Sequence, residues 1–204
     1  DLSSLGNNSR SNNNFKVVIR VRPPLPRELN GENAPFQNVI AVEPAARTIT
    51  ISENPDNVDD EGYLYKYGPY STHRFTFDHV YDQNATQENV YNNTAKAVVD
   101  SALEGYNATI FAYGQTGSGK TFTMGSGNNI GIRKEEMGLI PTVAIDIFKR
   151  IDQIKKDTPE IEFSVRVEFM EIYGEDMRDL LDPVGSGNGE HGIHLRTLQN
   201  GQIA

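Results

Sequence analysis

One run of eight residues has the side-chain types and spacing for polyphosphate chemistry: Gly114, Gln115, Thr116, Gly117, Ser118, Gly119, Lys120 and Thr121. The run matches the phosphate-loop pattern GxxxxGK(S/T) at every fixed position. Its glycines let the backbone adopt positive φ and approach a ligand closely, so that successive N–H groups can converge on an anion. We expect Lys120 to place its ammonium between the β and γ phosphates and Thr121 to give its hydroxyl to Mg²⁺.

A phosphate loop has to lie between a strand and a helix. The residues from Ala108 to Tyr113 are almost wholly apolar, which predicts a central strand buried on both faces directly before Gly114. A helix is expected to begin near Lys120, where its N-terminus would favour negative charge. This context favours a true phosphate loop over a glycine-rich loop that matches by accident.

Two arginines near the start of the ordered chain are the next candidates for binding. Apolar and polar residues alternate from Phe15 to Val21 and indicate a strand that stops at Pro23-Pro24. Arg20 and Arg22 have the same parity in this strand, so they should project from one face. Taken alone, the pattern favours surface arginines that pair with carboxylates over ligand-binding arginines.

The remaining periodicities predict an α/β fold, in which helices flank a mixed sheet. Expected strands are two short ones within 39–51 around Pro44-Ala45-Ala46, one containing Phe75 and Phe77, a long one over 163–173, and a last one at Ile193 and Leu195. Expected helices are one over about 87–104 and one opened by Pro141, with Ala144, Ile147, Ile151 and Ile154 on one face. Residues 1–14 should form a flexible tail, and 125–138 and 184–192 surface loops.

Composition excludes several classes of function. The 204 residues suit a single domain, and their net charge of −9 disfavours non-specific binding to nucleic acid or anionic membranes. The chain has no Cys, which rules out disulfides and thiolate metal sites. His191 and His194 lack further ligands for a metal, and the acidic stretch over 53–61 lacks the regular spacing of a calcium loop. We therefore predict a cytoplasmic protein with no membrane-spanning segment.

The phosphate loop and its flanks together resemble one family. The string GYNATIFAYGQTGSGKTFTM at 105–124 is similar to the kinesin motor signature almost residue for residue. Arg20-Val21-Arg22-Pro23 resembles the RxRP element of kinesins. FTFD at 75–78, QENVY at 87–91, GLIP at 138–141, EIYGE at 171–175 and DLL at 179–181 resemble further kinesin motifs. These motifs follow one another in the family's order, from about residue 15 to 203.

The resemblance implies a motor domain of the phosphate-loop NTPase type that binds ATP or ADP with Mg²⁺ and works on microtubules. Arg20, Arg22 and Pro23 would then belong to the element that borders the adenine, with Phe122 stacking from the opposite side. Lys120 would have the catalytic role at the phosphates. The loop over 125–138 would correspond to the family's variable loop beside the nucleotide pocket. Localisation to the cytoplasm and the microtubule cytoskeleton is implied as well.

Two kinesin motifs are missing from the sequence. The family's switch strings NxxSSRSH and DLAGSE, which close on the γ phosphate and help to hold Mg²⁺, do not occur in the 204 residues. The expectation is an incomplete motor domain over 15–204 that does not complete hydrolysis and has most microtubule contacts outside this chain. Two alternatives stay open: a truncated protein that binds nucleotide or a partner without turnover, and a non-motor phosphate-loop enzyme.

Overall fold

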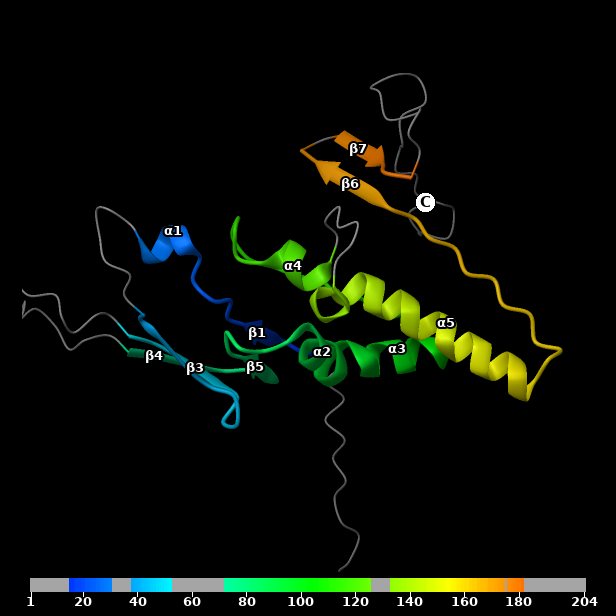
Figure 1. Ribbon diagram of the computed structural model, residues 1–204, viewed down its shortest axis with the longest axis horizontal. Coiled ribbons are helices and arrows are strands. Elements are labelled where there is room, and N and C mark those ends of the chain that lie inside the picture. The colour runs from blue at the N-terminus through cyan, green and yellow to red at the C-terminus, as the bar shows by residue number, and fades with distance from the viewer. Residues whose placement is uncertain (1–14, 31–37, 53–71, 126–132, 175, 182–204) are drawn as a thin grey trace, which may run out of the picture. The chain divides into compact units, whose positions relative to one another are not determined.

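The computed structural model describes residues 15–30, 38–52, 72–125, 133–174 and 176–181. The chain forms two compact units, Asp1–Arg150 and Ile151–Ala204, and Figure 1 shows the elements of each. The expectations for the 1–14 tail, the 53–61 and 184–192 loops, the strand at Ile193 and Leu195, and the two histidines His191 and His194 concern residues outside the described ranges.

Two small sheets lie in the first unit. Strand β1 (Val18–Arg20) pairs in parallel with β5 (His79–Tyr81), so that Arg20 lies opposite Tyr81. Strands β2 (Ile40–Glu43), β3 (Thr48–Ser52) and β4 (Thr72–Thr76) form an antiparallel ladder in that order. The turn between β2 and β3 confirms the two short strands expected around Pro44. Strand β5 and the short helix α1 (Pro26–Leu29) were not predicted.

One continuous helical segment follows β5 and confirms the helix expected over 87–104. It consists of α2 (Gln87–Val90), a π-helical stretch η1 (Tyr91–Ala95) and α3 (Lys96–Leu103). Thr86 caps its start, because the Thr86 hydroxyl accepts the Asn89 N–H at 3.1 Å. The π-helical turn widens the helix at Tyr91 and Ala95, both of which are buried.

A second group of helices begins at the phosphate loop. Helix α4 (Lys120–Met124) starts at Lys120, as predicted, and is followed by a 3₁₀ turn η2 (Lys134–Glu136) inside the stretch expected to be a surface loop. Helix α5 (Leu139–Asp157) begins before Pro141. The prediction of its buried face was partly wrong, because Ala144 is exposed while Leu139 and Ile151 are buried.

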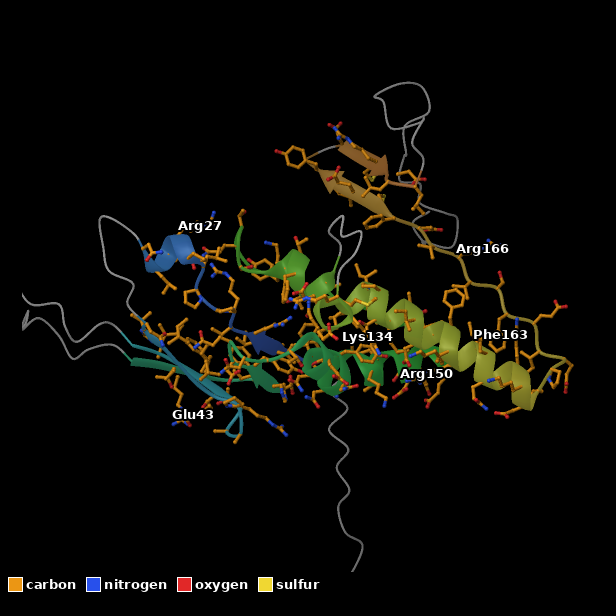
Figure 2. All side chains as sticks on the ribbon, viewed as in Figure 1. Arg27, Glu43, Lys134, Arg150, Phe163 and Arg166 are labelled. Carbon is orange, nitrogen blue, oxygen red and sulfur yellow. The ribbon has the colours of Figure 1, made fainter. Side chains whose placement is uncertain are left out.

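A polar network joins α5 to the helical segment before it. Arg150 of α5 forms ion pairs with Asp146 on its own helix and with Asp100 of α3, and Figure 2 shows Arg150 at this position. The Tyr91 hydroxyl donates to Asp146 at 2.6 Å. Burial and this carboxylate together raise the pKa of Tyr91 to about 12, so the phenol remains protonated and the hydrogen bond persists at neutral pH.

The core of the first unit lies directly beneath the flanks of the phosphate loop. Its buried members are Tyr81, Val90, Tyr91, Ala95 and Leu139. Ile110, shortly before the loop, and Met124, at the end of α4, both pack against this cluster. Burial of apolar side chains on either side of the loop therefore fixes where the loop begins and ends.

The prediction of a buried central strand over 108–113 was wrong for this structure. The residues form no ladder, and the Phe111 and Tyr113 side chains are 68% and 95% exposed. An apolar strand is buried only when strands pair with both of its edges and helices cover its faces. No described strand pairs with 108–113, so the segment is irregular despite its strongly apolar sequence.

The second unit contains a β-hairpin. Strands β6 (Met170–Tyr173) and β7 (Asp176–Asp179) pair antiparallel, with Tyr173 opposite Asp176. The long strand expected over 163–173 is thus reduced to its last residues. The stretch 161–169 forms no ladder with any described strand, although the Leu180 N–H donates to the Phe169 carbonyl at 2.8 Å.

Candidate functional site

The phosphate loop turns sharply between Gly114 and Lys120. Gly117 and Gly119 have φ angles of 81° and 101°, in the left-handed region that favours glycine. The Ser118 N–H donates to the Gln115 carbonyl at 3.1 Å, which closes the turn before α4 begins. A Cβ at Gly114 would lie 2.6 Å from the Ser118 hydroxyl oxygen, so a side chain there would require Ser118 to shift. This turned backbone from Gly114 to Lys120 is the candidate cradle for a compact anion.

Lys120 lies folded over this cradle. Its Nζ donates to the Gly114 carbonyl at 2.8 Å and to the Gln115 carbonyl at 3.0 Å. Thr121 follows on the first turn of α4 and is exposed. An ammonium at the loop and an adjacent hydroxyl oxygen fit the phosphates and Mg²⁺, because Mg²⁺ takes few protein ligands and keeps its phosphate and water oxygens. The described residues contain no cluster of three or more His, Cys, Asp or Glu side chains that could hold a metal by themselves.

Arg20 reaches from β1 to helix α4 and to the start of α2. Its guanidinium donates to the Gln87 side-chain oxygen at 2.8 Å, to the Thr123 hydroxyl at 3.1 Å and to the Ala85 carbonyl at 3.1 Å. The same group lies 5.2 Å from the centroid of the Phe122 ring. Partial burial lowers the pKa of Arg20, yet an arginine stays charged at neutral pH.

Gln87 is a buried polar residue that the sequence analysis did not select. Its amide donates to the Phe122 carbonyl at 2.7 Å and to the Glu136 carbonyl at 3.4 Å, while its oxygen accepts from Arg20. Gln87 therefore joins β1, α4 and η2. The signal that could have revealed it is its helical spacing, because Val90 and Tyr91 follow three and four residues later and share the buried face.

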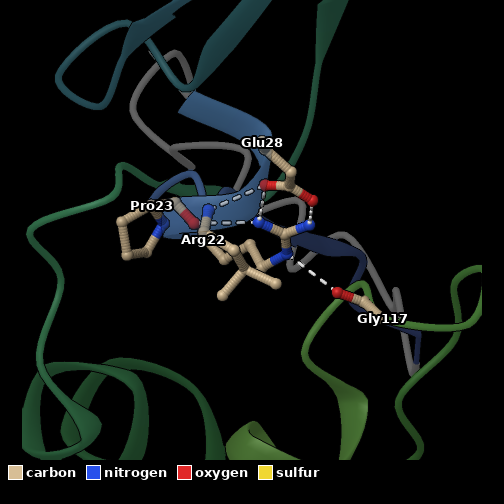
Figure 3. Close-up of polar contacts among 5 residues, drawn as sticks. Arg22, Pro23, Glu28 and Gly117 are labelled. Carbon is tan, nitrogen blue, oxygen red and sulfur yellow. Dashed lines mark hydrogen bonds and ion pairs between the residues drawn. The ribbon is translucent and has the colours of Figure 1, made fainter. Parts of the chain in front are cut away.

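Arg22 contacts the loop itself, as Figure 3 shows. Its Nε donates to the Gly117 carbonyl at 2.8 Å, and its two terminal nitrogens donate to the Glu28 carboxylate at 2.6 and 2.8 Å. A further bond joins Arg22 to the Pro23 carbonyl at 2.9 Å. The hydrogen bonds from Arg22, followed by one from the Leu25 N–H, lower the pKa of Glu28 to about 2.

The structure thus brings the predicted arginines and the loop together within the first unit. Arg20 and Arg22 both contact residues between 117 and 123, in keeping with their shared parity. Phe122 is 56% exposed beside them, and Pro23 is also exposed. Gln115 and Thr116 are exposed in the loop. Helix α1, which supplies Glu28, is the part of this arrangement that the sequence did not indicate.

Among the described helices, none has the length and apolar character required to cross a membrane.

Comparison with protein families gives a match over nearly the whole chain. The model of the family described as kinesin motor domain matches residues 20–203. The chain is 37% identical to kinesin-related protein 8 of Dictyostelium discoideum over 96% of its own length and 9% of that protein. It is 40% identical to kinesin-like protein KIF27 of Homo sapiens over 91% of its own length and 11% of that protein. The chain thus spans about one tenth of the length of these curated relatives.

A solved structure gives the same result for the fold. The chain superimposes on the solved structure of a fast kinesin with a TM-score of 0.72 at 32% sequence identity. That structure is described with implications for ATPase mechanism and interactions with microtubules. The match covers 94% of this chain and 46% of the solved chain. The α/β fold expected from the sequence, that of part of a motor domain, is therefore confirmed.

Proposed function

The chain belongs to the kinesin motor domain family, and from this premise we propose that it is the nucleotide-binding part of an ATP-driven microtubule motor. The observation that carries the proposal is the loop from Gly114 to Thr121. Its glycines adopt left-handed φ, its lysine lies over the cradle, and the core holds it at Ile110 and Met124.

At the phosphate end, the loop amides and Lys120 bind the polyphosphate, and Thr121 supplies one oxygen to Mg²⁺. When bound, Mg²⁺ neutralises part of the charge on the β and γ phosphates. Lys120 is free to exchange the two loop carbonyls for phosphate oxygens, because an ammonium on a four-carbon stem reorients easily. The ammonium then lies where charge moves in the transition state.

At the base end, Phe122 and Arg20 form one side of the site for adenine. The exposed Phe122 ring offers a flat apolar surface to a base, and Pro23 borders the same region. The Arg20 guanidinium lies near the ring and is held by Gln87, Thr123 and Ala85, which fixes the ring's surroundings before a base arrives.

Hydrolysis needs groups that position the attacking water, and we assign none of these to the 204 residues, because the family's two switch strings do not occur in them. The proposal is therefore binding without turnover by this chain, and turnover by a chain that also contains the switches. Most of the microtubule contact would come from outside these residues, since the chain is acidic and microtubules present an acidic surface.

Steady-state ATPase assays with and without microtubules test this proposal. The 204-residue chain should show no microtubule-stimulated phosphate release, while a longer form that continues through both switch strings should show it. The Lys120→Ala variant of the longer form is the control and should be inactive. Robust stimulated turnover by the short chain would contradict the proposed division of roles, and no stimulation in the longer form would contradict a motor function.

A further inference from the structure

Arg22 directs most of its hydrogen-bond donors to protein groups. Its Nε bonds to the Gly117 carbonyl, one terminal nitrogen bonds to both Pro23 and Glu28, and the other bonds to Glu28 (Figure 3). A guanidinium has five N–H donors in a fixed fork. Four of them are therefore accounted for by the protein. The resemblance to kinesins placed Arg22 among the residues around the nucleotide, yet its donors are directed to the loop and to α1.

The carboxylate of Glu28 is held equally firmly. It accepts both terminal nitrogens of Arg22 and, through Oε2, the Leu25 N–H at 2.8 Å, which anchors it to the start of its own helix. A two-point arginine–carboxylate contact fixes the plane of the guanidinium as well as its position. Consequently, Glu28 determines the direction in which the Arg22 Nε–H points.

The bond from Arg22 restrains the loop at Gly117. A peptide plane beside a residue without a Cβ reverses at little cost, and Gly117 and Gly119 both adopt left-handed φ. The peptide group is planar, so the bond from Arg22 to the Gly117 carbonyl and the bond from the Ser118 N–H to the Gln115 carbonyl hold the same plane from its two sides. A carbonyl oxygen that turned instead toward a bound phosphate would repel it. The Arg22 Cδ also packs close to Gly119, 3.9 Å from where its Cβ would lie.

We propose that Glu28 and Arg22 are a positioning pair for the phosphate loop, in which Glu28 orients Arg22 and Arg22 fixes the Gly117 carbonyl. This inference rests on the proposed nucleotide-binding function and reassigns Arg22 from a contact of the base to a support of the loop. Neither residue has to touch the nucleotide. Their effect falls on the affinity of the loop for phosphates.

Two probes separate support of the loop from contact with the base. Dissociation constants are measured for ADP and for inorganic tripolyphosphate, each with Mg²⁺, by titration calorimetry on the full 204-residue chain. The Glu28→Gln variant keeps the shape of the side chain but removes its charge. Glu43→Gln is the matched control, because Glu43 forms an exposed ion pair with Arg74 at 3.3 Å on the β2-β3-β4 sheet.

Glu28→Gln should raise both dissociation constants by a common factor of about ten, the effect of weakening one charge-assisted contact, while Glu43→Gln should leave both unchanged. An increase for ADP alone would overturn the proposal, because it would place the pair at the base. Unchanged constants for both probes would overturn it too. If the wild-type chain bound neither probe, the proposed function and this inference would fail together, whereas wild-type binding without an effect of Glu28→Gln contradicts this inference alone.

The charge-exchanged double variant Arg22→Glu/Glu28→Arg distinguishes positioning from simple stabilisation. It restores an ion pair and should recover part of the thermal midpoint, because an arginine at position 28 cannot accept the Leu25 N–H. A carboxylate at position 22, however, cannot donate to the Gly117 carbonyl. Tripolyphosphate affinity should therefore stay as weak as in Glu28→Gln. Recovery of wild-type affinity in the double variant would show that the pair only stabilises the fold, and would contradict the proposal.

Discussion

The guanidinium carbon of Arg20 lies 5.2 Å from the centroid of the Phe122 ring, within the range of a cation–π contact. The two residues come from β1 and α4, which the sequence separates widely, and three hydrogen bonds from Arg20 to Gln87, Thr123 and Ala85 hold the contact in place. One face of the Phe122 ring therefore faces the positive charge of Arg20. The ring's remaining exposed surface is available for stacking.

Removal of the Phe122 ring should weaken the binding of nucleotide but not of inorganic phosphates. We expect Phe122→Ala to raise the dissociation constant of Mg·ADP about tenfold, since stacking of a base on an aromatic ring contributes about 1–3 kcal/mol. Phe122→Tyr should bind as the wild type does. Phe148→Ala on α5 is the control, because Phe148 is similarly exposed at 54% but distant in sequence from the loop. Equal loss of ADP and tripolyphosphate affinity would contradict a base-stacking role.

Substitution of Gln87 should destabilise the first unit. Gln87 is only 5% exposed and bonds to Arg20 and to the Phe122 carbonyl, so Gln87→Leu removes both bonds and leaves Thr123 as the remaining partner of that Arg20 nitrogen. The expected loss in the free energy of unfolding is about 2 kcal/mol. Gln83→Leu, at an exposed position, should change it by less than about 0.5 kcal/mol. Urea denaturation followed by circular dichroism measures both, and similar values for the two variants would refute the assigned network.

Acid should remove the contribution of Glu28 to stability within a defined range of pH. The folded-state pKa of Glu28 is lowered from 4.5 to about 2 by its hydrogen bonds, so its contribution is fully present above pH 4.5 and is lost as the pH falls toward 2. The difference in stability between the wild type and Glu28→Gln should therefore be constant from pH 7 to 5 and should shrink below that. Denaturant titrations at stepped pH values measure it. A difference that persists unchanged at pH 2.5 would rule out an ionic origin.

The ends of the loop between α4 and α5 should tolerate no side chain. A Cβ on Gly138 would lie 2.3 Å from the Gly125 nitrogen, where rigid backbone leaves no space. We expect Gly138→Ala to lower the free energy of unfolding by about 3 kcal/mol. Gly105→Ala is the control, because Gly105 also has positive φ but nothing lies within 4 Å of its Cβ position, and it should cost about 1 kcal/mol. Equal melting temperatures for the two variants would show that the close approach of Gly125 and Gly138 does not matter.

Local patterns in the sequence predicted the local elements well. The pattern around Pro44 predicted two short strands, and the helical spacing over 87–104 predicted a helix. The structure confirms both elements. The start of α4 at Lys120 followed from the phosphate-loop pattern. Elements that depend on distant partners were not predictable in this way. The apolar run 108–113 has the composition of a central strand, but a strand forms only where neighbours supply hydrogen bonds, and no described strand does so.

The candidate site shows the same limit. The positions of Lys120, Thr121, Arg20 and Arg22 could be taken from motif and parity, because each motif carries its own geometry. The partners that hold those side chains could not. Glu28 lies six residues after Arg22 on a short helix that no periodicity in the sequence predicts. Gln87 reaches Arg20 only because the fold brings the first turn of α2 within hydrogen-bonding distance of a side chain from β1. Such contacts depend on tertiary packing, which cannot be predicted from local patterns in a single sequence.

The most direct test of the central claim is calorimetric titration of the 204-residue chain with Mg·ADP, comparing the wild type with Lys120→Ala. The wild type should bind one equivalent of nucleotide, and Lys120→Ala should bind at least about a hundredfold more weakly, because the ammonium is the charged group of the loop that we assign to the phosphates. Unchanged melting temperatures of the two proteins would show that the fold is intact. Absence of binding by the wild type, or equal binding by both, would contradict a phosphate-loop nucleotide site at Gly114–Thr121.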